Sequence, residues 1–264
     1  MVSLLVTFNE FSRRGKRNSW RLHFNQISVN NGPKIRTGLI IFFAAPNLQL
    51  VVIADGVGGN NGGNVAAEET VAALGRYFTQ EAPKTVRTAK AWFRDKVRLV
   101  NKLILNKANS NLNYRGMGTT MVAAILIDNV AVVANIGDSR GYIFHQDLLT
   151  QITVDHSLVN ELVKNGDLTE QEAAHSPQNN IITRAIGIST DAEIDVNSFE
   201  LGENDQLLLC TDGLSKMVEG DQIAAVLAGH ESLEDKCADL IKLANAAGGN
   251  DNVTVLISQN DQEN

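Results

Sequence analysis

The sequence predicts an α+β domain in which antiparallel β-sheets are covered by helices. Three features of the chain support this fold class. Strand-like segments occur in blocks, the two longest helix-like segments follow one another directly, and the two types do not alternate strictly along the sequence. Strict alternation would favour a doubly wound parallel sheet, so its absence argues against that architecture.

Seven segments predict strands or hairpins, because they are rich in aliphatic and aromatic residues and bounded by turn-forming residues. They cover residues 4–12, 37–45, 48–55, 119–138, 141–146, 206–212 and 252–259. Within the fourth segment, Asp128 and Asn129 form a tight-turn pair between two apolar runs, which predicts a hairpin.

Six segments predict helices, because apolar residues recur at helical spacing. They cover residues 64–78, 88–108, 155–164, 170–174, 221–227 and 233–247. In the second segment, for example, Trp92, Val100 and Leu103 share one helical face. Residues 165–195 show little periodicity overall, which predicts a loop-rich flap.

Length and composition predict one globular domain. The 264 residues can bury a full core, and the apolar fraction of 44% and charged fraction of 20% are ordinary for such a protein. No proline- or serine-rich linker divides the chain. We expect residues 1–258 to form the domain and residues 259–264 to form a polar tail.

The net charge and the number of cysteines indicate which binding partners and which cellular compartment to expect. A net charge of -7 argues against nucleic acid or an anionic membrane as the main partner, and no apolar run has the length of a membrane span. The start "MVSLLVTF" resembles a strand more than a signal peptide. The two cysteines, Cys210 and Cys237, do not support a disulfide framework. We therefore expect a cytoplasmic protein. Separately, we expect it to be a monomer.

Four aspartates stand at the ends of apolar strands. Asp55 in "VVIADG", Asp138 in "NIGDSRG" and Asp212 in "LLLCTDG" each close a strand, and Asp251 in "GGNDNVTV" opens one. A single Asp-Gly pair is more often only a turn. Four carboxylates gathered at one place would repel one another, however, unless divalent cations lay between them. Magnesium and manganese prefer such oxygen ligands, and the carbonyl of Gly56 could approach a metal without steric hindrance.

The motifs taken together resemble a known family. In order they are "ADGVGG", "GMGTTMVAAIL", "VANIGDSRGYIF", "LTQITVDHSLVNELVKNGDLTEQEA", "NIITRAIG", "DQLLLCTDGLSKMV" and "GGNDNVTVLI". They resemble the motifs of bacterial protein phosphatase 2C-like, metal-dependent (PPM) serine/threonine phosphatases, from about Phe11 to Ser258. The resemblance implies a four-layer αββα sandwich, with two antiparallel β-sheets flanked by helix pairs and a binuclear metal centre at one end.

The resemblance also assigns metal ligands. Asp55 matches the acid that bridges two Mn²⁺ or Mg²⁺ ions, and the Gly56 carbonyl matches a further ligand. Asp212 and Asp251 match the acids that complete the shell of the first ion. Asp138 matches the residue that holds a weaker third ion together with Asp212.

An arginine near the start of the chain is expected to bind the substrate phosphate. Arg17 in "SRRGKRNS" is the best match, with Arg13 and Arg14 as competitors. An alternative alignment uses Arg21, four residues before Asn25. Arg17, Asp55 and Asp212 are thus the implied catalytic residues.

The first motif departs from the family pattern. The simplest interpretation is a short insertion at residues 20–24, with Ile27 in place of an aspartate that organises water on the second ion. Gln26, the neighbouring polar residue, would be a weaker ligand. We therefore expect looser binding of the second ion.

Residues around the aspartates are expected to have structural roles. His156 and Asp155 are predicted to cap and orient the helix that begins nearby, rather than to act as acids. Thr119 and Thr120 are predicted to begin a strand beside the metal site, and Ser139 is predicted to hold the turn after Asp138.

The resemblance implies an enzyme that hydrolyses phosphoserine and phosphothreonine on a phosphorylated protein substrate and opposes a bacterial serine/threonine kinase. Ile27 leaves a second possibility, a catalytically weakened pseudophosphatase that acts as a signalling or binding module. A third is a stage-II-sporulation-type phosphatase acting on one regulatory partner, which would be expected to carry sensor domains.

Overall fold

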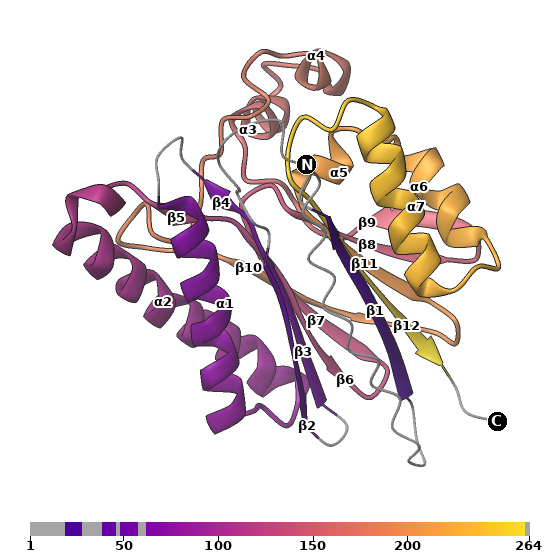
Figure 1. Cartoon of the computed structure of the whole chain (residues 1–264), viewed down its shortest axis with the longest axis horizontal. Helices are drawn as coiled ribbons and strands as arrows, with labels where there is room; N and C mark the ends of the chain where they lie inside the picture. The colour runs from indigo at the N-terminus through magenta and orange to yellow at the C-terminus, as the bar shows by residue number, and fades with distance from the viewer. Residues whose placement is uncertain (1–18, 28–38, 46–47, 58–61, 262–264) are drawn as a thin grey trace.

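The computed structural model describes residues 19–27, 39–45, 48–57 and 62–261. In these residues the strands form two five-stranded antiparallel sheets, and a pair of two-residue strands accompanies them (Figure 1). Across the first sheet the order is β1 (Ser19–Ile27), β12 (Val253–Asp261), β11 (Gln206–Cys210), β8 (Arg140–His145) and β9 (Leu148–Gln151).

The second sheet and the short strand pair are built from the middle of the chain. Across the second sheet the order is β10 (Asp195–Glu200), β7 (Val130–Ile136), β6 (Met121–Ile127), β3 (Leu48–Ala54) and β2 (Leu39–Ala45). The short pair joins β4 (Gly56–Val57) to β5 (Gly118–Thr119). The predicted hairpin around Asp128 and Asn129 is confirmed as the turn between β6 and β7.

Helices cover the outer faces of both sheets. Helices α1 (Gly63–Gln80) and α2 (Val86–Ser110) pack on the second sheet, and α6 (Gly220–Ala228) and α7 (Leu233–Ala246) pack on the first (Figure 1). The predicted αββα layering is therefore confirmed. None of the helices in the described ranges is both long and apolar enough to cross a membrane.

The remaining short helices lie mainly at one end of the sandwich. They are η1 (Leu112–Tyr114), α3 (Leu158–Asn165), α4 (Glu170–Ala174) and α5 (Asp212–Ser215). In Figure 1 the segments α3, α4, α5, β4 and β5 gather at the top of the molecule. The predicted flap, residues 165–195, contains α4 and the start of β10.

Apolar side chains form three layers, one under each pair of helices and one between the sheets, and these layers explain why the sequences of the central strands are continuously apolar. In β3, Leu50 and Val52 belong to the core under α1 and α2, whereas Val51 and Ile53 face the other sheet. In β11, Leu208 and Cys210 pack under α6 and α7, whereas Leu207 and Leu209 lie between the sheets. Successive side chains of a strand point to opposite faces, so a strand buried on both faces shows no polar alternation.

The N-terminal expectations are only partly testable. The strand predicted at residues 4–12 lies outside the described residues. The expected insertion at residues 20–24 lies within β1, whose register against β12 runs continuously from Ser19 opposite Asp261 to Ile27 opposite Val253. The expected polar tail needs a correction, because residues 259–261 belong to this ladder.

The antiparallel ladders bring the four aspartates to the same end of the sandwich. Asp55 follows β3, Asp138 lies two residues beyond β7, and Asp212 lies two residues beyond β11. Asp251 lies two residues before β12. Because β12 runs antiparallel to β11, its start lies at the same edge as the end of β11.

Candidate metal and phosphate site

One pocket of about 410 Å³ collects the predicted metal ligands. Its lining includes Asp55, Gly56, Asp138, Asp212 and Asp251. The flap contributes further lining residues, namely Asn179, Asn180 and Ile182. The fold therefore gathers residues that are far apart in the sequence, at the edge where their strands end.

The main chain at Asp55 is held by two threonines. The Asp55 carbonyl accepts hydrogen bonds from the Thr119 hydroxyl and the Thr120 N–H, each at 2.8 Å. Both threonines are buried: Thr119 is the last residue of β5, and Thr120, which lines the pocket, directly precedes β6. Thr119 also exchanges backbone hydrogen bonds with Ile186, which ties the end of the flap to the same point.

The two Asp-Gly pairs need glycine because the backbone packs closely there. A Cβ atom on Gly56 would lie 2.3 Å from the carbonyl carbon of Gly63. A Cβ atom on Gly213 would lie 2.2 Å from the carbonyl oxygen of Asn252. Such distances are far below van der Waals contact. Gly213 therefore allows the Asp212 turn to pack against the segment that carries Asp251.

The turn at Asp138 is organised by a buried histidine. Gly137 has a φ of +101°, and its N–H donates to His156 Nδ1 at 3.2 Å. Since Nδ1 accepts, the proton is on Nε2, which donates to Asp195 at 3.3 Å. Burial lowers the pKa of His156, and the charge of Asp195 only partly opposes this. The contacts indicate a positioning role.

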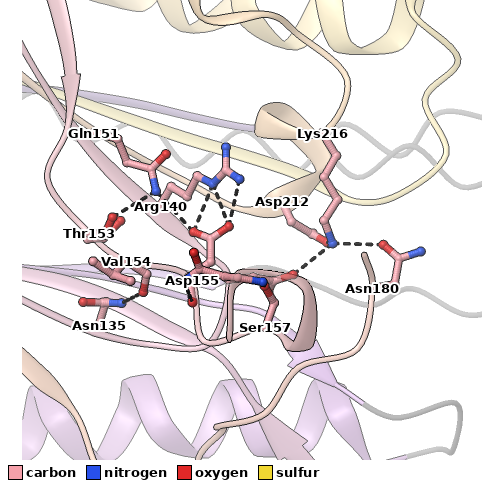
Figure 2. A network of polar contacts seen from close by, with 12 residues as sticks. Asn135, Arg140, Gln151, Thr153, Val154, Asp155, Ser157, Asn180, Asp212 and Lys216 are labelled. Atoms are coloured by element: carbon pink, nitrogen blue, oxygen red, sulfur yellow. Dashed lines mark hydrogen bonds and ion pairs between the residues drawn. The ribbon is translucent and has the colours of Figure 1, made fainter. Parts of the chain in front are cut away.

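The helix cap needs a correction, because Ser157, rather than His156 or Asp155, is the N-cap of α3. Asp155 instead forms a bidentate ion pair with Arg140, whose Nε donates to Oδ1 at 3.1 Å and whose Nη2 donates to Oδ2 at 2.8 Å (Figure 2). Ser139 holds the turn after Asp138, as predicted, through a 2.7 Å hydrogen bond to the Thr120 hydroxyl.

Lys216 is the site residue that the sequence interpretation missed. Its ammonium donates to Asp212 Oδ2 at 2.7 Å and to Asp138 Oδ2 at 2.9 Å. A third contact, at 3.0 Å, reaches Asn180 Oδ1 in the flap (Figure 2). The available signal was the spacing Asp212 to Lys216, which places both side chains on the same side of a helical turn.

The charges in the pocket act on one another. Burial, followed by the negative charge of Asp212, raises the pKa of Asp138. Burial alone would lower the pKa of Lys216, but the carboxylates of Asp212 and Asp138 outweigh it and raise that pKa. The lysine therefore stays an ammonium and offsets part of the negative charge.

The donor chemistry of the pocket fits hard divalent cations. Asp55, Asp138, Asp212 and Asp251 supply carboxylate oxygens, which are the ligands that such ions prefer, and Gly56 also lines the pocket. Among the described residues, no three His, Cys, Asp or Glu side chains lie close enough together to form a metal site by themselves. The pocket thus collects suitable donors, while Lys216 already binds two of them.

The N-terminal site predictions have different outcomes. Arg17, Arg13 and Arg14 lie outside the described residues. Ile27 is opposite Val253, so its backbone lies at the edge of the sheet near the aspartates. Arg21 is six residues earlier in β1, opposite Gln259, and thus about 20 Å from Ile27 along the strand. The alternative in which Arg21 binds the phosphate stays a prediction.

Comparisons with known proteins agree with this architecture. The family model of protein phosphatase 2C matches residues 40–254. A serine/threonine phosphatase from Listeria monocytogenes is 39% identical over 222 residues, which are 84% of this chain and 88% of the relative.

Solved structures are similar over almost their whole length. The serine/threonine phosphatase of S. agalactiae superposes with a TM-score of 0.86 and 37% identity, covering 91% of this chain and 99% of that one. The catalytic domain of the serine/threonine phosphatase PstP, solved with two manganese ions, gives a TM-score of 0.76 and 30% identity, covering 93% and 99%.

Proposed function

The chain belongs to the protein phosphatase 2C family of serine/threonine phosphatases, and from this premise we propose that it dephosphorylates phosphoserine and phosphothreonine in proteins with divalent cations held by the pocket aspartates. The observation that carries the proposal is the convergence of Asp55, Asp138, Asp212 and Asp251 on one pocket. Burying several carboxylates is costly unless cations or hydrogen bonds compensate them.

Two cations, Mn²⁺ or Mg²⁺, would be held by Asp55, Asp212 and Asp251 with help from the Gly56 carbonyl. The similar PstP catalytic domain contains two manganese ions, which supports this number. Thr119 and Thr120 fix the main chain at Asp55, and Gly213 lets the Asp212 and Asp251 segments meet.

Bound divalent cations would lower the pKa of a water molecule and stabilise charge on the transferred phosphoryl group. The chain's own residues would position the substrate around this centre. Arg17 is proposed to bind the phosphate, because a planar guanidinium can contact two phosphate oxygens at once. The flap residues Asn179 and Asn180, which line the pocket, would face the bound phosphoprotein.

A covalent cysteine mechanism is disfavoured by burial. Cys210 and Cys237 are both buried, and neither lines the pocket. Burial raises the pKa of Cys210 to about 12, so its thiol stays protonated near neutral pH. Hydrolysis by water is therefore the supported route.

The physiological partner is proposed to be a bacterial serine/threonine kinase whose products this enzyme dephosphorylates. The alternative is a weakened pseudophosphatase. It is favoured by Ile27, the last residue of β1, which stands where the family pattern has an aspartate. The retained carboxylates argue for the active enzyme, because the ammonium of Lys216 offsets only part of the negative charge that four acids bring to the pocket.

The test is hydrolysis of a phosphothreonine peptide during a manganese titration. We expect manganese-dependent release of phosphate, no release from a phosphotyrosine peptide, and loss of activity in Asp212→Asn. Asp221→Asn, an exposed acid in α6, is the matched control and should behave like the parent. A folded parent that binds manganese but releases no phosphate would establish the pseudophosphatase instead. Ile27→Asp should lower the manganese concentration needed and raise turnover.

A further inference from the structure

The ammonium of Lys216 is surrounded by three oxygens at the edge of the pocket. Asp212, Asp138 and Asn180 each accept a hydrogen bond from it, at distances of 2.7 to 3.0 Å. A lysine ammonium has three donors, so this set satisfies all of them. Figure 2 shows the side chain reaching from α5 toward Asp212 and Asn180.

The local fold directs this side chain into the pocket. Helix α5 begins at Asp212 and is one turn long, and the Lys216 N–H donates to the Asp212 carbonyl at 2.9 Å. Residues four apart on a helical turn are neighbours, so the Lys216 side chain lies beside the Asp212 carboxylate. The same turn is anchored by Gly213 against Asn252.

The contact differs from an ordinary surface ion pair. The exposed fraction of the side chain is 5% for Asp138 and 22% for Lys216. Partial burial strengthens charge interactions and reduces their screening by salt. The ammonium is also shared by carboxylates from two different strand ends, which a surface pair seldom achieves.

We propose that Lys216 is a built-in cation that takes the place of a third metal ion between Asp138 and Asp212. The inference rests on the proposed function of the pocket as a metal site. A divalent ion entering between these two carboxylates would have to displace the ammonium from both and would be repelled by it. The chain should therefore hold two divalent cations, with Lys216 supplying the third positive centre.

The experiment counts bound manganese in the full-length protein without substrate. Calorimetric titration and electron paramagnetic resonance of free Mn²⁺ are compared for the parent, Lys216→Met and the matched surface control Lys102→Met. We expect two ions per chain in the parent and the control, and three in Lys216→Met. The double variant Lys216→Met, Asp138→Asn should return to two ions, because one ligand of the added ion is gone.

The outcomes separate this inference from the proposed function. If the parent binds two ions and Lys216→Met also binds two, or if the parent already binds three, the role assigned to Lys216 is wrong although the metal site stands. If the folded parent binds no manganese, the proposed metal site fails and the inference fails with it. Should Lys216→Met not fold, Lys216→Gln, which keeps a hydrogen-bond donor without charge, should show the same gain of one ion.

Discussion

Asn101 joins helix α2 to the end of the flap, and its replacement should measurably destabilise the protein. The side chain is fully buried. Its Oδ1 accepts from the Gly187 N–H at 2.7 Å, and its Nδ2 donates to the carbonyls of Ser189 at 2.9 Å and Thr190 at 3.2 Å. In Asn101→Ala these three backbone groups lose their partner inside the protein.

The three hydrogen bonds set the size of the effect. At about 1 kcal/mol of net stability for each bond, the change should lower the free energy of unfolding by about 3 kcal/mol. Activity should fall as well, because Ile186 pairs with Thr119, and the Thr119 hydroxyl supports the Asp55 carbonyl. Asn101→Asp keeps the acceptor but turns an oxygen toward two carbonyls, so it should be at least as destabilising.

Urea unfolding followed by tryptophan fluorescence measures this loss. Asn106→Ala is the matched control, since Asn106 is exposed on the same helix, and it should change stability by less than about 0.5 kcal/mol. If Asn101→Ala were as stable as that control, the three hydrogen bonds between Asn101 and the flap would not stabilise the protein, and the reasoning would be refuted.

Three further predictions follow from the packing. Gly213→Ala should abolish most phosphatase activity, since its Cβ would lie 2.2 Å from the Asn252 carbonyl oxygen, whereas Gly220→Ala, where the added Cβ meets open space, should leave the rate unchanged. Phe93→Ala should cost about 3–5 kcal/mol of stability in a urea titration, because the ring is fully buried in the core; a cost below 1 kcal/mol would contradict the packing. Iodoacetamide at about pH 8 should leave Cys210 unmodified in the native protein, because burial raises its pKa to about 12, and mass spectrometry should find alkylation only after unfolding.

The central strands and the aspartates at their ends could be predicted because their signals are local. Both faces of β3 and β11 are buried, so each strand is a continuous apolar run that ends at an Asp-Gly pair. The antiparallel order then places these ends at one edge. The reason for glycine, close packing on Gly63 and Asn252, needed the structure.

The missed features depend on long-range contacts. Strands β9 and β10 are edge strands with partly exposed side chains, so they lack the apolar signal of the central strands. Aspartate is a common helix N-cap, so Asp155 was a reasonable prediction for α3. In the structure the Asp155 carboxylate binds Arg140 instead, and Ser157 is the N-cap. The role of Lys216 depends on the convergence of Asp138 and Asp212, which only the folded chain shows.

The most direct measurement of the central claim is a crystal grown with manganese and examined by anomalous scattering. Two peaks should lie in the pocket among the carboxylates of Asp55, Asp212 and Asp251, with the ammonium of Lys216 still between Asp138 and Asp212. A well-ordered pocket without an anomalous peak beside those carboxylates would contradict the account.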